Sequence, residues 1–233
     1  MPPATQSMDY KIPTGLAAVT LLILAAAILI PGGKGPDNGS PALPWQIAID
    51  AAGNASVFGL TLGRDTLAHA EERFQTKAEV SLFASPAGTF SVEAYFQRLY
   101  IDGIRADFVL TLDIDQAAAA RMYERGLRLS KMGSGTKKVS LAADDLSATR
   151  DAAILLITYL PAANLDEELL RSRFGEPARR IREASGISHW LYPEKGLDIA
   201  LNPDGKEVFQ YTSPANFHRI EQPLQQEPAP PRR

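Results

Sequence analysis

The chain has 233 residues, of which 45% are hydrophobic and 22% charged, a balance typical of a globular protein with one or two modest cores. Its formal net charge is -3, so it lacks the basic character of a nucleic-acid-binding protein. It contains no cysteine, which excludes disulfides, thiolate catalysis, thiolate metal sites and a lipid-modified cysteine.

The strongest signal is an uncharged apolar run near the N-terminus, which extends from Ile12 through Leu21 to Ile30. At ~1.5 Å per residue, a helix of this length spans about 28 Å, close to the hydrocarbon thickness of a bilayer. The alternative is a cleaved signal peptide, but its apolar run is usually shorter, about 7–15 residues, and ends in small residues. We therefore expect a single-pass signal anchor in the bacterial inner membrane, with the rest of the chain in the periplasm.

The region after this anchor contains two similar segments. A helix-like stretch, Arg64–Phe74, recurs as Asn164–Phe174, and each copy follows an apolar run that suits a strand, Ala55–Leu62 or Ala153–Leu160. Each copy is also followed by alternating runs typical of an antiparallel meander. These runs are Glu79–Phe83, Thr89–Phe96 and Ile104–Asp113 in the first copy, and Arg180–Ala184, Ile187–Tyr192, Leu197–Leu201 and Glu207–Thr212 in the second.

Between the copies, Asp115–Met132 is rich in alanine, begins with aspartate and precedes Gly133, a pattern that predicts a connecting helix. The expected fold class is α+β: an N-terminal transmembrane helix, then two strand-helix-antiparallel-meander repeats joined by a helix. The expected parts are a short cytoplasmic tail (1–11), the transmembrane helix (12–30), a flexible linker (31–45), the first repeat (46–114), the connecting helix and loop (115–150), the second repeat (151–217) and a disordered proline-rich tail (218–233).

One stretch of the second copy carries a family resemblance. Phe174-Gly175-Glu176-Pro177, then Gly186, then His189-Trp190-Leu191-Tyr192 and the run LDIALNPDGKEV resemble the small lipoproteins of the outer-membrane β-barrel assembly machinery, the BamE/SmpA/OmlA family. The resemblance covers Asn164–Tyr211, and the first copy matches much less. A tandem pair of such units is also similar to the β-lactamase inhibitor protein. Both resemblances imply protein binding without catalysis, although the lipoproteins' acylated cysteine is absent here.

The sequence offers little for catalysis. His69, His189 and His218 have no spacing that suits zinc, and a lone strand histidine is more often structural than catalytic. The segment from Gly133 to Lys138 lacks the spacing of a phosphate-binding loop. Asp113 and Asp115 could ligate a cation, but both stand where a helix needs an N-cap. We therefore expect that this protein is not an enzyme and that it has no cofactor and no metal site.

Aromatic residues of the second copy form a candidate protein-binding surface. Side chains alternate between the faces of a strand, which separates Trp190, Tyr192, Phe209 and Tyr211 from the aliphatic residues of the same strands. Aromatic side chains with polar tips are common anchors of protein interfaces. The alternative is that this face is buried against the first copy or the connecting helix.

Basic residues form a second candidate surface. Arg121, Arg125 and Arg128 share one face of the predicted connecting helix, and Lys131 adjoins them. Such a face could rest on anionic lipid headgroups. The alternative is an ordinary solvated helix surface.

Together these patterns predict a membrane-tethered periplasmic protein-binding or scaffolding subunit of a cell-envelope complex. A second hypothesis is a lipid or small-molecule carrier with an apolar groove between the two units. A third is a tethered inhibitor of a periplasmic enzyme. The expected partners are envelope proteins and the membrane, with lipid as a further candidate and nucleic acid excluded.

Overall fold

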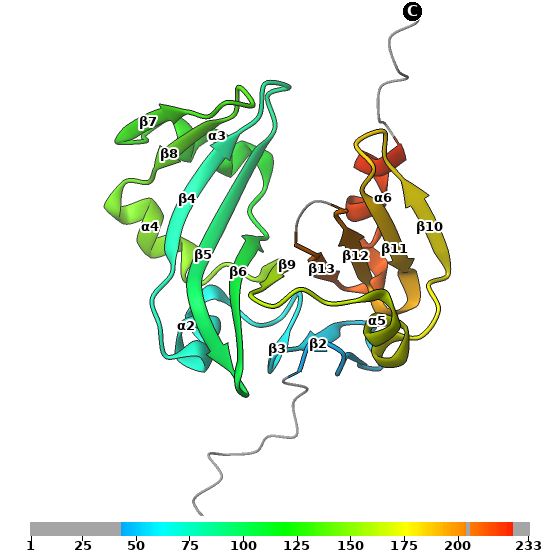
Figure 1. The fold of residues 1–233 in the computed structure, drawn as a ribbon. Helices are drawn as coiled ribbons and strands as arrows, with labels where there is room; N and C mark the ends of the chain where they lie inside the picture. The colour runs from blue at the N-terminus through cyan, green and yellow to red at the C-terminus, as the bar shows by residue number, and fades with distance from the viewer. Residues whose placement is uncertain (1–42, 204–205, 226–233) are drawn as a thin grey trace, which may run out of the picture. The chain divides into compact units, whose positions relative to one another are not determined.

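The computed structural model describes residues 43–203 and 206–225 (Figure 1). The predicted transmembrane segment Ile12–Ile30 and most of the predicted linker lie outside these residues. Among the helices that are described, none has the length and apolar character needed to cross a membrane.

A ten-stranded antiparallel sheet dominates the described part, and Figure 1 shows β7 at one extreme and β10 at the other. The strand order is β10-β11-β12-β13-β9-β6-β5-β4-β8-β7. The strands are β4 (Glu79–Ala84), β5 (Phe90–Ile101), β6 (Ile104–Leu112), β7 (Arg128–Lys131), β8 (Lys137–Ser140), β9 (Ile154–Pro161), β10 (Arg179–Arg182), β11 (Ser188–Tyr192), β12 (Leu197–Leu201) and β13 (Val208–Thr212).

A separate three-stranded sheet comprises β1 (Ala48–Ile49), β2 (Ala55–Val57) and β3 (Leu60–Thr61). The single strand predicted for Ala55–Leu62 is therefore wrong, because Phe58 and Gly59 turn the chain between β2 and β3. Both turn residues have positive φ, 57° and 78°, as in the tight hairpin turns that follow the twist of paired strands. A side chain at Gly59 would also collide with the guanidinium of Arg73.

The helices described are α2 (Leu67–Phe74), α3 (Gln116–Glu124), α4 (Ala143–Thr149), α5 (Glu167–Phe174) and α6 (His218–Gln225), with 3₁₀ turns at Pro193–Lys195 and Pro214–Asn216. Asp115 caps α3, as predicted, and its carboxylate accepts a hydrogen bond from the Ala118 amide. The cap of α5 is Asp166, so this helix begins later than the stretch Asn164–Phe174 that the sequence indicated. Thr66 and His69 form a reciprocal capping box on α2, which gives His69 a structural role.

The predicted fold class is contradicted by the continuity of the large sheet. Strand β9, expected to belong to the second repeat alone, pairs with β6 on one side and β13 on the other. The strands that precede α2 form the separate small sheet, so the first half lacks a counterpart of β9. Two equivalent repeats joined by a helix are therefore not observed.

The predicted connecting helix and C-terminal tail also need correction. Helix α3 ends at Glu124, and Gly126 packs so closely on Val139 that a side chain there would overlap it. The chain then pairs as β7 against β8 and extends the sheet. Residues 218–225 form α6 and bury Ile220, although disorder was expected there.

One face of the sheet carries the main core, and Phe58 lies at its centre. The Phe58 ring is 5.0 Å from that of Phe108 in β6, 5.1 Å from Tyr159 in β9 and 5.3 Å from Tyr211 in β13. Phe74 of α2 joins the same cluster through Phe108. These contacts fasten the small sheet to both halves of the large one.

We predict that Phe58→Ala lowers the free energy of unfolding by about 3–5 kcal/mol, because it empties the centre of this cluster. Phe58→Gly loses the same ring but relieves the positive φ, which costs a non-glycine residue about 1–2 kcal/mol. Urea denaturation of the purified protein should therefore rank native above Phe58→Gly above Phe58→Ala. The reverse order of the two variants would contradict backbone strain at this position.

Candidate functional site

The four aromatic residues expected on an exposed surface are all in the core. Trp190, Tyr192, Phe209 and Tyr211 have exposures of 2%, 4%, 0% and 1%. The register explains this burial: Trp190 pairs with Ile199, and Phe209 pairs with both Ile199 and Tyr159, so aromatic and aliphatic side chains share one face. These four side chains are therefore buried, as the alternative interpretation of the sequence expected, and they do not form an exposed binding surface.

The four basic residues expected on one helix face are divided between two elements. Arg121 lies in α3, and Arg125 caps its C-terminus and binds Asp145 through two hydrogen bonds of 3.1 and 2.5 Å. Arg128 and Lys131 lie on β7. A single basic helix face is therefore not present in the described chain.

The edge strand β7 and the residues on either side of it expose apolar side chains to solvent. Leu127, Leu129 and Met132 are 74%, 52% and 47% exposed, and they are three of the seven large hydrophobic residues that are exposed in the described chain. All four residues of β7 itself are exposed. Leu129 lies on the face of the buried Val139, and Met132 lies on the opposite face. Because monomeric proteins seldom leave apolar side chains exposed on both faces of an open edge, this segment is a candidate interaction site.

The backbone of β7 offers unpaired hydrogen-bonding groups along its outer side. Met132 donates its N–H to the carbonyl of Thr136 at 2.8 Å, so residues at even positions of β7 are those bonded to β8. The alternation of an antiparallel ladder then directs the N–H and C=O groups of Leu129 and Lys131 away from β8. We refer to β7 together with Leu127 and Met132 as the β7 edge.

The β7 edge is basic as well as apolar. Strands β7 and β8 contain Arg128, Lys131, Lys137 and Lys138 and no acidic residue. Lys138 is neutralised by Glu79 at 2.8 Å, whereas in the part of the chain described no carboxylate lies within 4.0 Å of Arg128 or Lys131. The edge therefore carries positive charge that the fold leaves uncompensated.

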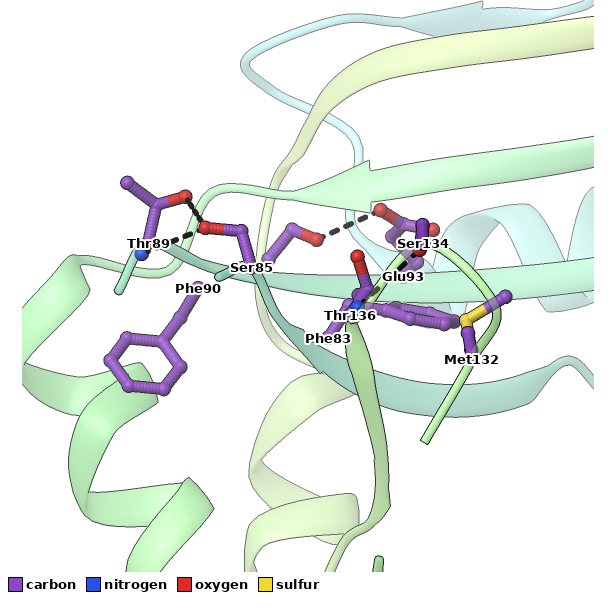
Figure 2. Close-up of a pocket in the computed structure, with 9 residues that line it drawn as sticks. Phe83, Ser85, Thr89, Phe90, Glu93, Met132, Ser134 and Thr136 are labelled. Carbon is purple, nitrogen blue, oxygen red and sulfur yellow. Dashed lines mark hydrogen bonds between the residues drawn. The ribbon is translucent and has the colours of Figure 1, made fainter. Parts of the chain in front are cut away.

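A groove of about 420 Å³ lies beside one end of the β7 edge (Figure 2). Phe83, Phe90 and Met132 form its apolar part, and the rest is lined mainly by hydroxyl groups. Some of these hydroxyl groups are already bonded within the groove: Ser85 Oγ lies 2.7 Å from Thr89 Oγ1, and Ser91 Oγ donates to Glu93 Oε1 at 2.8 Å. The groove can therefore accept a side chain that emerges from a strand laid along β7.

His189 lies on the face of the sheet opposite the main core, between two carboxylates. Its Nδ1 is 2.8 Å from Asp198 Oδ2, and its Nε2 is 3.0 Å from Glu183 Oε1. Burial alone lowers the pKa of His189, but hydrogen bonds and charge from Asp198 and Glu183 outweigh it, so the pKa lies above the ordinary value. Two carboxylate partners favour a doubly protonated ring with no lone pair to act as a base.

Asp198 is fully buried, and burial raises its pKa against the hydrogen bond and charge of His189. Ser185 donates to Glu183 at 2.7 Å and does not contact the imidazole. The cluster thus lacks a nucleophile–base pair. Its arrangement is that of a buried ionic network which fixes the register of β11 and β12.

Sequence reasoning missed both the β7 edge and the carboxylate partners of His189. Gly126 followed by the alternation of Leu127 and Leu129 was a signal for a strand. The pairing of His189 with Asp198 depends on the β11–β12 register, in which the two residues are diagonal neighbours. His218 lies exposed on α6, and its Nδ1 is 3.2 Å from the Ala215 carbonyl oxygen.

No protein-family model, curated protein or solved structure matches this chain at a significant level.

The raised pKa of His189 predicts a pH-dependent stability. A group whose pKa is higher in the folded than in the unfolded state stabilises the fold below the unfolded value, and this contribution is lost as pH rises through the folded value. The urea midpoint of the native protein should therefore fall on the alkaline side of about pH 6.5. His189→Gln should remove this part of the pH dependence. An NMR titration with a His189 midpoint at or below about 6.5 would contradict the assignment.

Proposed function

We propose that this protein is a non-enzymatic binding subunit of a cell-envelope complex and that it recruits its partner by strand addition at the β7 edge. The observation that carries this proposal is the exposure of Leu129 on the terminal strand of the sheet and of Leu127 and Met132 on either side of it. A partner strand laid there would gain main-chain hydrogen bonds and cover apolar side chains in one step.

The charge of the edge defines the partner. Arg128 and Lys131 favour an extended segment that contains acidic residues among apolar ones. A second copy of this chain fits poorly, because a β7–β7 pair would gather Arg128 and Lys131 of both copies on one narrow ribbon, and β7 has no acidic residue to offset them. The groove beside Met132 would receive one side chain of the partner and add specificity.

Basic residues on an edge strand also serve to prevent aggregation, and β10 illustrates this simpler role. There, Arg179 pairs with Glu221, Arg180 pairs with Glu176 at 2.8 Å, and Ile181 is partly buried beside α6. The β7 edge differs because its apolar side chains are exposed and are not covered by a helix. Protection alone does not account for exposed leucines.

The absence of catalysis in this proposal is supported by His189, whose ring nitrogens both face carboxylates. The resemblance of Asn164–Tyr211 to the small envelope lipoproteins supports the same class of function, protein binding. The third hypothesis, inhibition of a periplasmic enzyme, would also use an exposed surface and is included in the test below through the identity of the partner.

The proposed location is the periplasmic side of the bacterial inner membrane, and its support is the uncharged run Ile12–Ile30. We predict that the protein stays with membranes through a carbonate wash and that alkaline phosphatase fused after Arg233 is active. A soluble processed form that begins near Lys34 would contradict membrane attachment, and an inactive fusion would contradict the orientation.

For the β7 edge, we predict that a photocrosslinking residue at Leu129, introduced in intact cells, crosslinks to one major envelope protein. Mass spectrometry should map the crosslink to an extended acidic segment of that protein. Leu129→Glu adds repulsion toward such a segment, and truncating a central interface residue typically costs ~2 kcal/mol or more, so affinity should fall at least thirtyfold.

Two matched variants make this test specific. Lys131→Pro removes an outward N–H without breaking a β7–β8 bond, so it should weaken partner binding while the urea midpoint stays nearly unchanged. Tyr100→Glu changes another exposed hydrophobic residue, at 71% exposure, and should leave partner binding intact. Equal loss from Tyr100→Glu, or crosslinks from Tyr100 with none from Leu129, would refute the proposed site.

A further inference from the structure

A cavity of about 330 Å³ lies on the core face of the sheet, away from the β7 edge in the strand order. Residues of both halves line it: Ile104 and Pro161 at the β6–β9 pair, Phe209 of β13 and Phe174 of α5, with Trp45 from the chain before β1. Its volume lies within the range of small-molecule sites, and its walls are mainly apolar, as those sites usually are.

One polar side chain reaches this cavity without a partner. Tyr159 is almost fully buried, its ring packs on Phe58, Phe108 and Phe209, and burial raises its pKa to about 12. The phenol is therefore neutral and able to donate. Within residues 43–203 and 206–225 its hydroxyl makes no hydrogen bond, and it is open to the cavity and not fully enclosed by protein. The hydroxyl of a buried tyrosine usually finds a partner. Two other tyrosines of this core do so: Tyr192 donates to the Gly175 carbonyl at 2.9 Å, and Tyr211 donates to the Pro44 carbonyl at 3.1 Å.

The charge around the cavity restricts what could satisfy this hydroxyl. Arg105 contributes to the lining, but its ladder position, next to the core-facing Ala106, directs its side chain to the opposite face of the sheet. Arg173 packs over the Trp45 ring, but burial is the only influence on the pKa of Tyr159, so no cation acts on its hydroxyl and a carboxylate in contact with it would lack a counter-ion. Water can reach this hydroxyl from the open side of the cavity, so a ligand that binds here must replace that hydrogen bond with an acceptor of its own.

We propose that this cavity binds a small, uncharged, largely apolar molecule whose single hydrogen-bond acceptor, such as a carbonyl oxygen, accepts from the Tyr159 hydroxyl. The site adds a ligand-binding activity to the proposed partner binding and does not depend on it. It gives a defined location to the carrier hypothesis raised by the sequence.

The test compares two probes of nearly the same shape, acetophenone and ethylbenzene, of which only acetophenone has an acceptor oxygen. The full chain is held in detergent-free nanodiscs of phosphatidylethanolamine and phosphatidylglycerol, and binding is followed by the fluorescence of Trp45, one of two tryptophans in the chain. We expect both probes to bind and acetophenone to bind about fivefold more tightly, the contribution of one hydrogen bond.

Tyr159→Phe removes only the hydroxyl, and it should abolish this fivefold preference while ethylbenzene binds as before. The matched control is Tyr95→Phe, which removes a hydroxyl that donates to Asp107 at 2.9 Å on the other face of the sheet. It should leave both affinities unchanged. An unchanged urea midpoint for Tyr159→Phe would show that the loss of preference is not caused by unfolding.

Several outcomes would overturn the inference. These are failure of both probes to bind, a preference for acetophenone that survives Tyr159→Phe, tighter binding of octanoate than of acetophenone, and binding that appears only after residues 1–42 are removed. The third result would indicate an anionic amphiphile, and the fourth would indicate that the N-terminal segment of the chain itself occupies the cavity. Leu129→Glu should not alter probe binding, so failure here and failure at the β7 edge are distinguishable.

Discussion

The aromatic cluster around Phe58 is the constraint on which the described structure depends. A single ring contacts β6 of the first half and both β9 and β13 of the second, and it does so from the tip of a hairpin in a different sheet. Each aromatic pair of this kind contributes about 0.5–1.5 kcal/mol beyond its buried area. The cluster therefore holds Phe58 in a backbone conformation that few non-glycine residues adopt.

The fold was predictable from the sequence where local pattern and tertiary context agree. The strands Leu197–Leu201 and Val208–Thr212 lie close to their expected positions, because alternation and the turn between them indicate the same hairpin. The β7 segment was assigned to a helix because it follows an alanine-rich helix without a proline, and pairing with β8 overrides that local preference. The β6–β9 pairing that merges the halves joins segments about fifty residues apart, and no local pattern encodes it.

The candidate sites show a similar division. Alternation correctly separates the residues of a strand into two sets, but it does not say which set faces the core. Trp190 and Phe209 were therefore placed on the surface, although the register joins them to Ile199 beneath α5 and the small sheet. The β7 edge escaped notice for the opposite reason: its alternation was clear, but a helix had already been assigned there. The first error concerns the surroundings of a strand, and the second concerns the existence of the strand itself.

The hydrogen bond from Tyr211 to Pro44 described above, together with a second long-range bond, has a consequence for the order in which this protein can fold. The Ser213 hydroxyl accepts from the Ala55 amide, 158 residues earlier, and the Tyr211 hydroxyl donates to the Pro44 carbonyl, 167 residues earlier. Gly196 packs closely on Thr212, the residue between Tyr211 and Ser213, and any side chain at Gly196 would collide with the Thr212 carbonyl. The first strands of the chain thus reach their final partners only after β13 has been synthesised. A nascent chain that emerges N-terminus first must keep β1, β2 and the Phe58 hairpin unfinished until almost the whole protein is present, a delay during which a chaperone has the greatest opportunity to bind.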